Sequence, residues 1–346
     1  MHGTRPLAWP HALALALVAF LLFGAAGEPP YRVLQRYQPG GDGGWDYVTV
    51  DGDGKRLFVS RSTRVQVLSL ADGSLLGEIQ DTPGVHGIAL APDLHKGFTS
   101  NGRDSSVTVF NLSTLAPIGR IDVQANRPDA ILYEPVTHRV FTFNGGSANA
   151  TAIDGATGKV VGHVALGGRP EFAVHDGRGH VFVNIEDKSE LVRFDPKTLA
   201  VSARWSLAPG EEPSGLALDR AHRRLFSVCD NQKMIVMDAD KGTVLATLPI
   251  GSGVDGAAYD PERGLAFASC GQGVLTVVRE ESPTKFEVVE NDSTQRTART
   301  VALDDATHKL YLPAASFGPA PAPTAETPRP RPPMVPGSFS VLVVGR

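Results

Sequence analysis

The chain has 346 residues, which is long enough for two average domains or for one large all-β domain. Hydrophobic residues make up 42% and charged residues 20% of the chain, a balance that permits a substantial core and excludes a disordered protein. The formal net charge of −4 provides no positive field that would attract nucleic acid.

The first 26 residues predict a secretory signal peptide. The basic residue Arg5 is followed by the apolar run "ALALALVAFLLF" and by the small residues "GAAG", which suit a cleavage site. A membrane anchor is the alternative, but the run is too short to span a bilayer comfortably and no basic stop-transfer flank follows it. We therefore expect residues 1–26 to be removed, and the mature chain to be periplasmic or secreted and to contain no membrane span.

One pattern of short strands recurs along the rest of the chain. Two of its copies are "VFTFNGGSANATAIDGATGKVVGHV" and "LFSVCDNQKMIVMDADKGTVLATLPI". The copies start near residues 48, 88, 131, 173, 216, 257 and 301, so that successive starts are 40 to 44 residues apart. A period of about 42 residues with four short strands is typical of a β-propeller blade. Residues 31–346 are therefore expected to form an all-β fold, a seven-bladed β-propeller.

The seventh copy is incomplete at the C-terminus. It ends after "SFSVLVVGR" with three strands accounted for, whereas residues 31–47 resemble the fourth-strand segment of the other copies. We predict that the N-terminal strand closes the last blade, which would remove the two free strand edges.

The copy "FTFNGGSANATAIDGATGKVVGHVALGGRP" resembles the repeat of the YVTN-repeat, YncE-like β-propeller family. The likeness covers nearly all of residues 31–346 and implies the propeller fold. It also implies a candidate activity, because some similar propellers are lactonases in which a cation polarises the ester carbonyl. Blade 6 departs most from the pattern, since "VVREESPTKFEVVEND" lacks the Asp and the Thr-Gly turn.

Functional residues are expected where the blades differ at one matched position. The position just before each innermost strand, at one mouth of the central channel, carries mostly charged residues: Asp46, His86, Asp129, Glu171, Ser214, Asp255 and Arg299. A second column closes the second strands: Arg61, Asn101, Asn144, Ile185, Cys229, Cys270 and Ala314. Together these columns predict a polar channel mouth.

Three interpretations of this mouth remain open. It is a solvated rim in which Arg299 pairs with Asp255 and Asp46, or it is a binding site for a small polar ligand or a protein partner. The third is a divalent metal held by Asp129 and Glu171 with Asn144 or His86 nearby, and oxygen ligands of this kind favour calcium, magnesium or manganese.

The metal interpretation would make the protein a lactonase-like hydrolase. Glu171 or Asp129 would then act as ligand or base, with His86 as the proton carrier. The chain contains no nucleophile motif, phosphate-binding loop or metalloprotease motif. The sequence therefore favours a non-catalytic binding scaffold, with no cofactor assigned with certainty.

Nucleic acid is not the expected partner. Carboxylates dominate the mouth and only 7% of the residues are aromatic, whereas single-strand binding needs a basic groove with stacking aromatic rings. A lateral patch containing Arg61, Arg64 and Arg103 remains open as an alternative.

The two cysteines, Cys229 and Cys270, occupy matching positions in blades 5 and 6. Export would permit a disulfide between them, but matched second-strand positions of neighbouring blades lie far apart for such a bridge. Buried free thiols are favoured, and a soft-metal pair is the least favoured alternative.

Four histidines precede a basic residue at the same repeated turn: His95, His138, His222 and His308. Their repetition favours a turn residue on the opposite face over a metal site.

Residues 319–337 form a proline-rich insertion in blade 7. They replace the short loop between the second and third strands, so they should leave from the mouth face as an extended segment. The insertion is either a disordered loop or a flap over the mouth, in which Arg329 and Arg331 would be available to a carboxylate ligand.

Overall fold

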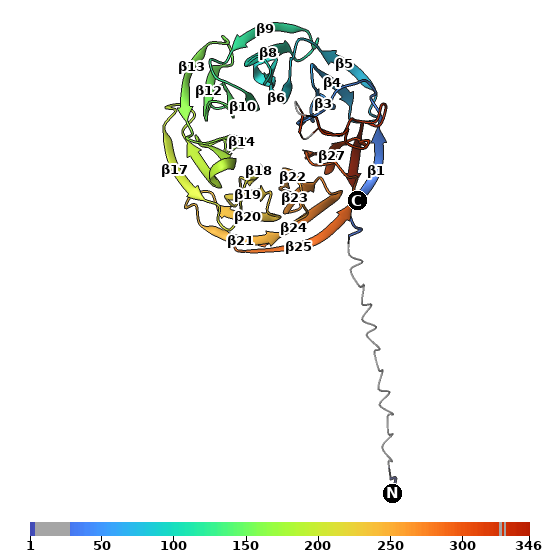
Figure 1. Cartoon of the computed structure of the whole chain (residues 1–346). Coiled ribbons are helices and arrows are strands. Elements are labelled where there is room, and N and C mark those ends of the chain that lie inside the picture. The colour runs from blue at the N-terminus through green and yellow to red at the C-terminus, as the bar shows by residue number, and fades with distance from the viewer. Residues whose placement is uncertain (4–27, 325–326, 329) are drawn as a thin grey trace.

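Seven four-stranded antiparallel sheets form a closed ring in the computed structural model (Figure 1), which confirms the seven-bladed β-propeller. The structure describes residues 1–3, 28–324, 327–328 and 330–346. The predicted signal peptide therefore lies almost wholly outside the described residues. No helix within the described ranges has the length and apolar character needed to cross a membrane.

The strands of blades 1 to 3 follow the chain from the axis outward (Figure 1). Blade 1 consists of β2 (Val48–Asp51), β3 (Arg56–Arg61), β4 (Arg64–Ser69) and β5 (Leu75–Ile79). Blade 2 consists of β6 (Val85–Ala91), the 3₁₀ helix η1 (Pro92–Leu94), β7 (Lys96–Asn101), β8 (Ser106–Asn111) and β9 (Pro117–Asp122). Blade 3 consists of β10 (Pro128–Glu134), β11 (Arg139–Asn144), β12 (Asn149–Asp154) and β13 (Val160–Ala165).

Blades 4 to 6 repeat this order. Blade 4 consists of β14 (Pro170–His175), β15 (Val181–Ile185), the 3₁₀ helix η2 (Glu186–Lys188), β16 (Glu190–Phe194) and β17 (Val201–Ser206). Blade 5 consists of β18 (Pro213–Asp219), β19 (Arg224–Cys229), β20 (Lys233–Asp238) and β21 (Val244–Pro249). Blade 6 consists of β22 (Val254–Asp260), β23 (Leu265–Cys270), β24 (Val274–Ser282) and β25 (Lys285–Ser293).

Blade 7 joins the two ends of the chain, as the sequence predicts. Its strands are β26 (Ala302–Asp304), β27 (Lys309–Ala314), β28 (Ser340–Gly345) and, outermost, β1 (Arg32–Tyr37). β1 pairs antiparallel with β28, with Arg32 opposite Gly345 and Tyr37 opposite Val341. The ring is therefore closed by backbone hydrogen bonds between the first and the last strand.

The second strand of each blade is buried along almost its whole length. These strands are covered on both sides because apolar residues of adjacent blades pack face to face. Phe141 of β11 and Phe194 of β16 are one such pair, with ring centroids 5.3 Å apart. The core thus lies between the blades, and it leaves little solvent contact for any residue on a second strand.

The innermost strands of blades 2 to 6 begin three residues earlier than the sequence pattern indicates, at Val85, Pro128, Pro170, Pro213 and Val254. The difference arises from a β-bulge near the start of each of these strands. The bulge interrupts the alternation of apolar residues, so the sequence pattern of a strand can be recognised only from the residues after the bulge. The innermost strands begin on one face of the disc, here named the ring face, and end on the opposite, far face.

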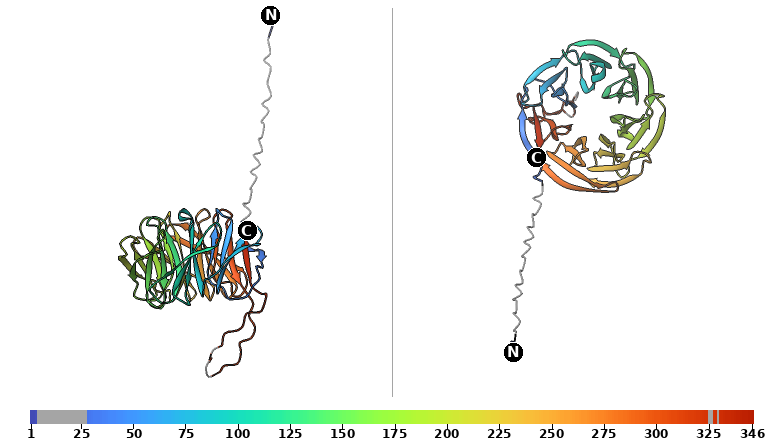
Figure 2. Two further views of the ribbon diagram at one scale, coloured as in Figure 1. Left: turned by 90° about the horizontal axis from the view of Figure 1, so that it is seen from above. Right: turned by 180° about the vertical axis from the view of Figure 1, so that it is seen from behind.

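The proline-rich insertion connects β27 to β28 and leaves from the ring face. Its two arms pair at their base, through a bridge between Phe317 and Met334 and hydrogen bonds such as Gly318 N–H to Pro333 O at 2.9 Å. Figure 2 shows this connection projecting from the disc on the side away from the C-terminus. The described parts of the insertion thus form an arm that projects from the ring face.

Candidate functional site

The first predicted column forms a ring at the ring face, here named the charged ring: Asp46, His86, Asp129, Glu171, Ser214, Asp255 and Arg299. In blades 2 to 6 the ring residue lies within the β-bulge, as His86 does between Val85 and Ile88. A bulge turns a side chain out of the regular alternation of the strand. This local irregularity directs one polar residue per blade toward the axis.

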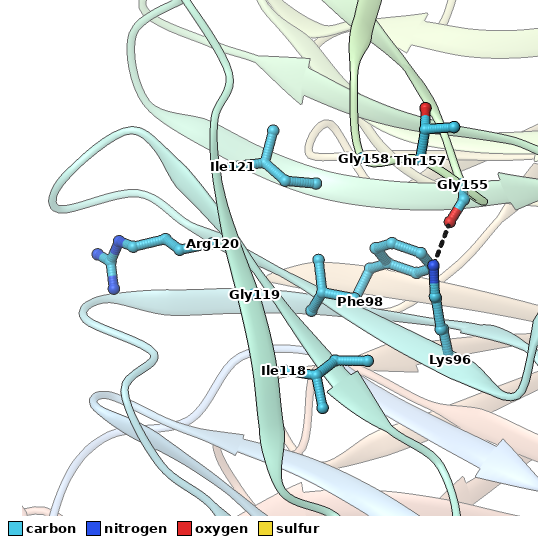
Figure 3. A pocket seen from close by; sticks show the side chains of 10 residues that line it. Lys96, Phe98, Ile118, Gly119, Arg120, Ile121, Gly155, Thr157 and Gly158 are labelled. Carbon is cyan, nitrogen blue, oxygen red and sulfur yellow. Dashed lines mark hydrogen bonds between the residues drawn. The ribbon is translucent and has the colours of Figure 1, made fainter.

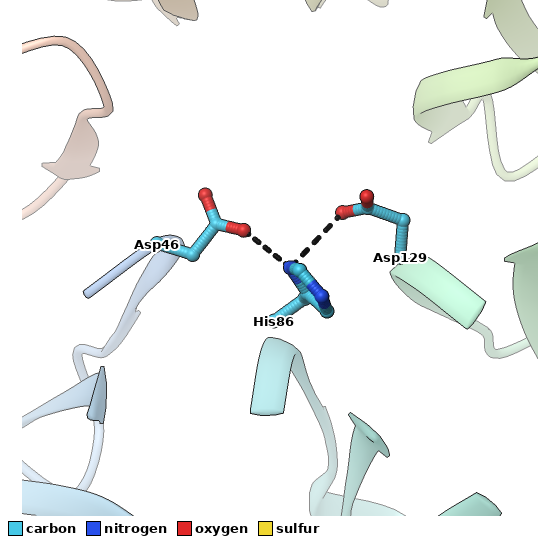
Figure 4. Close-up of side chains that lie close together, drawn as sticks. All are labelled: Asp46, His86 and Asp129. Atoms are coloured by element: carbon cyan, nitrogen blue, oxygen red, sulfur yellow. Dashed lines mark hydrogen bonds and ion pairs between the residues drawn. The ribbon is translucent and has the colours of Figure 1, made fainter. Parts of the chain in front are cut away.

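Ion pairs join five of the seven positions into a continuous arc. Arg299 Nε lies 2.7 Å from Asp255 Oδ2, and Arg299 Nη2 lies 3.6 Å from Asp46 Oδ1. His86 Nδ1 then lies 2.6 Å from Asp46 Oδ2 and 3.6 Å from Asp129 Oδ1 (Figure 4). The predicted pairs of Arg299 are thereby confirmed. The side chains of the arc are 20–44% exposed, so a ligand can reach them.

The acidic members of the ring repel one another in a partly desolvated setting. Burial raises the pKa of Asp255 to about 6, because the opposing effect of Arg299 does not fully compensate. Burial and the neighbouring carboxylates also raise the pKa of Asp129 and Glu171. For His86, burial disfavours the charged imidazole, but the hydrogen bond to Asp46 and the charge of Asp129 outweigh it and raise the pKa. The ring therefore holds an excess of negative charge that is only partly neutralised.

Glu171 and Ser214 lie outside the arc. Ser214 Oγ donates to the carbonyl of Val254 at 3.2 Å, which ties it to the next blade. The carboxylate of Glu171 has neither an ion pair nor a hydrogen-bond donor among the described residues. It is the one acidic group of the ring whose charge no neighbour balances within the described part of the chain.

Two arginines of the ring face are not predicted by the column analysis. Arg127 and Arg169 each precede a proline and a ring acid, in the repeated order Arg-Pro-Asp and Arg-Pro-Glu. With His86 and the two acids they line a cavity of about 60 Å³, and Arg169 Nη2 lies 2.6 Å from Glu186 Oε1. The repeated Arg-Pro-acid triplet is the sequence signal that could have revealed them.

The second predicted column does not line the mouth, and this part of the expectation is corrected. Arg61, Asn101 and Asn144 are fully buried. Arg61 donates to the carbonyls of Gly40, Gly41 and Gly43 at 2.9–3.1 Å and lies over the ring of Phe339. These side chains are buried because they lie at the ends of second strands, which adjacent blades cover on both faces.

The asparagines of this column hold their own blades together. Asn101 Nδ2 donates to Ser106 Oγ and Thr108 Oγ1, and Asn144 Nδ2 donates to Asn149 Oδ1 and Thr151 Oγ1. Both amides are therefore occupied by hydrogen bonds inside the sheet.

Of the metal ligands suggested by the sequence, Asp129 and His86 lie together, whereas Asn144 is turned into its blade and Glu171 is not part of the converging set. The donor atoms that do converge, within 4.8 Å of one another, belong to Asp46, His86 and Asp129. Two carboxylates and an imidazole can hold a divalent ion, so Asp46 takes the place of Glu171 as the second carboxylate ligand. The sequence signal for this set is that the three residues come from consecutive blades.

Cys229 and Cys270 are buried free thiols, so the disulfide left open by the sequence is not formed. Burial raises the pKa of Cys229 to about 12 and of Cys270 to about 11. Neither thiol has the exposed, anionic character that metal binding requires.

The structure places the three arginines of the lateral patch differently. Arg61 is buried, Arg64 Nε lies 2.9 Å from Glu78 Oε1, and Arg103 is exposed.

A second cavity lies between blades 2 and 3, far from the axis (Figure 3). It measures about 210 Å³ and is lined by Phe98, Ile118 and Ile121 among others, while Lys96 Nζ already donates to the carbonyls of Gly155 and Ala156. Arg120, the other basic residue of the lining, pairs with Asp104, so this cavity offers packing space rather than convergent chemistry.

Comparisons with known proteins identify the fold class. No protein-family model matches the chain, and no curated protein matches it either. Among solved structures it is similar to a chain of Kuenenia stuttgartiensis hydrazine synthase, with a TM-score of 0.69 and 16% sequence identity over 79% of this chain and 93% of that chain. At that identity the likeness supports the β-propeller architecture alone.

Proposed function

We propose that the protein is an exported propeller of the YVTN-repeat, YncE-like kind that serves as a non-catalytic binding scaffold. Its binding site is the charged ring, and it receives a small polar ligand or a polar group of a protein partner. The group bound nearest to the axis is positively charged. Concave sites in which a few polar groups converge are the usual places for ligand binding, and the charged ring brings one residue of each blade together.

The observation that carries this proposal is the set of three acidic groups with raised pKa, Asp129, Glu171 and Asp255. Each is destabilised in its charged form by burial and by the other carboxylates. An ammonium or guanidinium group placed among them would favour the charged forms. Glu171 is the strongest candidate for the direct contact, because no described residue neutralises it.

The arginines at the edge of the ring extend the same site. Arg127 lies beside Asp129 and His86, close enough for its charge to affect both groups. A ligand with an amine toward the axis and an acidic group toward Arg127 would match both signs of charge.

A second candidate is a divalent-metal-dependent hydrolase of the lactonase type. It is favoured by the convergence of Asp46, His86 and Asp129. A bound ion there would supply Lewis-acid polarisation of an ester carbonyl. His86 Nδ1 would have to be unprotonated to bind the ion, so Glu171, which lies outside the ligand set, would be the group that acts as acid or base.

Ligand-dependent thermal stability separates the two candidates. Putrescine, L-arginine, citrate, CaCl2 and MnCl2 would each be added to the full chain, to Glu171→Gln and to Glu262→Gln. Glu262 serves as the control because it is an exposed carboxylate on the far face. We expect putrescine or L-arginine to stabilise the unmodified chain and the control, by about 2.7 kcal/mol at 100 times the Kd, and to have little effect on Glu171→Gln.

Two results would contradict the scaffold proposal. One is the absence of any shift with both cationic probes, and the other is an equal shift in Glu171→Gln. Hydrolysis of a lactone that requires manganese or calcium and is lost in His86→Gln would instead establish the second candidate.

A further inference from the structure

A second cluster of acidic and imidazole groups lies on the far face, between blades 5 and 6. Asp219 ends β18, His222 stands in the turn that follows, and Glu280 lies near the end of β24. Their donor atoms all lie within 4.8 Å of one another. This cluster is separated from the charged ring by the length of the innermost strands.

Both carboxylates of the cluster are withdrawn from water. The side chain of Asp219 is 2% exposed and that of Glu280 is 3% exposed. His222 Nδ1 lies 2.6 Å from Asp219 Oδ2 and 3.5 Å from Glu280 Oε1. The side chain of His222 is 55% exposed, so the cluster opens to solvent on the imidazole side.

Glu280 carries an unsatisfied oxygen that points into the cluster. Its Oε2 accepts a hydrogen bond from Tyr259 O–H at 2.9 Å, whereas the fully buried Oε1 has no hydrogen-bond partner. A buried carboxylate oxygen without a donor is costly unless a ligand or a proton satisfies it. The hydrogen bond from Tyr259 fixes the carboxylate so that Oε1 faces His222 and Asp219.

The repeat shows that Glu280 is not needed for the blade itself. At the matched position of other blades, the residue donates its N–H to a turn carbonyl just as Glu280 donates to Gly264. The residues at that position in blades 1, 2, 3 and 5 are Leu70, Leu112, Gly155 and Ala239. Among these five blades, only blade 6 has a carboxylate at this position, where the others have an apolar or small residue. The position lies in the segment of blade 6 that departs most from the repeat.

His222 differs from the other turn histidines because Glu280 lies beside it. His138 pairs with Asp93 at 2.8 Å, and His308 pairs with Asp260 at 2.8 Å and with the exposed Glu262. Only His222, among these described turn histidines, has two nearly fully buried carboxylates within 4 Å of its Nδ1. The structural role expected for the group therefore does not fully account for His222.

We propose that Asp219, His222 and Glu280 form a binding site for a divalent transition-metal ion of the zinc type, with Tyr259 orienting Glu280. The donor set is one imidazole nitrogen and two carboxylate oxygens, which zinc accepts together with a water in a fourth position. Calcium is disfavoured because it requires six to eight oxygen ligands. The fit needs only a small adjustment, because ligand atoms at ~2.0–2.1 Å from zinc lie roughly 3.3 Å apart in a tetrahedron.

The chemistry of binding is a proton exchange. Nδ1 of His222 must be unprotonated to donate its electron pair, so the proton that it shares with Asp219 leaves as the ion enters. Hydrogen bonds from the backbone N–H groups of Ala221 and His222 hold Asp219 Oδ1, which leaves Oδ2 for the ion.

Calorimetric titration of the full chain with ZnCl2, after removal of metal with a chelator, tests the site. The titration is made in a His86→Gln background, so that the cluster at the charged ring cannot bind the ion. We expect one equivalent of zinc to bind. Adding Glu280→Gln should weaken binding about tenfold or more, and adding Glu281→Gln, the adjacent and less buried acid, should leave it unchanged.

The fold provides a second variant in case Glu280→Gln does not fold. His222→Asn changes a half-exposed turn residue, and it should abolish zinc binding and the visible absorption of bound cobalt. The proposal is overturned if the His86→Gln chain binds no stoichiometric zinc, if Glu280→Gln binds as tightly as Glu281→Gln, or if calcium binds more tightly than zinc.

Discussion

The closure of the ring by β1 makes a quantitative prediction for Tyr37. This residue ends β1 and is 3% exposed. Its O–H donates to the carbonyl of Leu70 at 2.7 Å, its ring lies against Tyr311, and its side chain covers Gly73. Tyr37 therefore connects blade 7 to blade 1 at the point where the two ends of the chain meet.

Replacing Tyr37 by Ala should lower the free energy of unfolding by about 3–5 kcal/mol, the usual cost of removing a large aromatic ring from a core. Tyr37→Phe should cost about 1 kcal/mol, because it removes only the hydrogen bond to Leu70. Leu34→Ala on the same strand should change stability by less than about 0.5 kcal/mol, since Leu34 is 41% exposed.

Urea denaturation of the three variants, followed by tryptophan fluorescence, measures these differences. The matched pair on β1 separates the loss of closure from a general effect of altering the strand. If Tyr37→Ala and Leu34→Ala lose the same amount, β1 does not close the ring in the way that its packing indicates.

Two further predictions concern titration and thiol chemistry. The pKa of Asp255 is raised from 3.8 to about 6, so the protonated carboxyl group stabilises the folded state at low pH. This contribution to the free energy of unfolding is at most about 3 kcal/mol; it is present below pH 4 and is lost as the pH rises through 6. The difference in unfolding free energy between the unmodified chain and Asp255→Asn, measured by urea denaturation from pH 4 to 8, should show this decline, and a flat difference would contradict it. The buried thiols of Cys229 and Cys270 should react with a thiol reagent only on unfolding, and reductant should leave the melting temperature unchanged; rapid labelling of the native chain would refute their burial.

The fold was predictable because the sequence contains seven copies of one strand pattern. The period set the number of blades, and the missing fourth strand of the last copy led to the pairing of β1 with β28. The start of each innermost strand was less predictable, since the bulge at residues such as Pro128 to Ile131 breaks the alternation on which strand recognition depends.

The candidate site was predictable in one column and not in the other. Counting positions places residues at the same height in every blade, but it does not give the direction of a side chain. Asp129 lies in a bulge and faces the axis, whereas Asn144 ends a second strand and is enclosed by its neighbours. The difference depends on the packing between blades, which no single repeat encodes.

Comparing matched positions of the blades also shows which residues the fold does not require. Leu112 and Ala239 show that a buried or small apolar side chain completes the far face of a blade, so the carboxylate of Glu280 at the matched position is a burden that the fold does not require. An isolated buried charge shifts its pKa or finds a partner. Because Tyr259 satisfies only one oxygen of Glu280, the remaining oxygen demands a proton or a cation. The same reasoning applies at the ring face, where Glu171 is the acid without a counter-charge among the described residues, so a cationic ligand would stabilise the protein there as well.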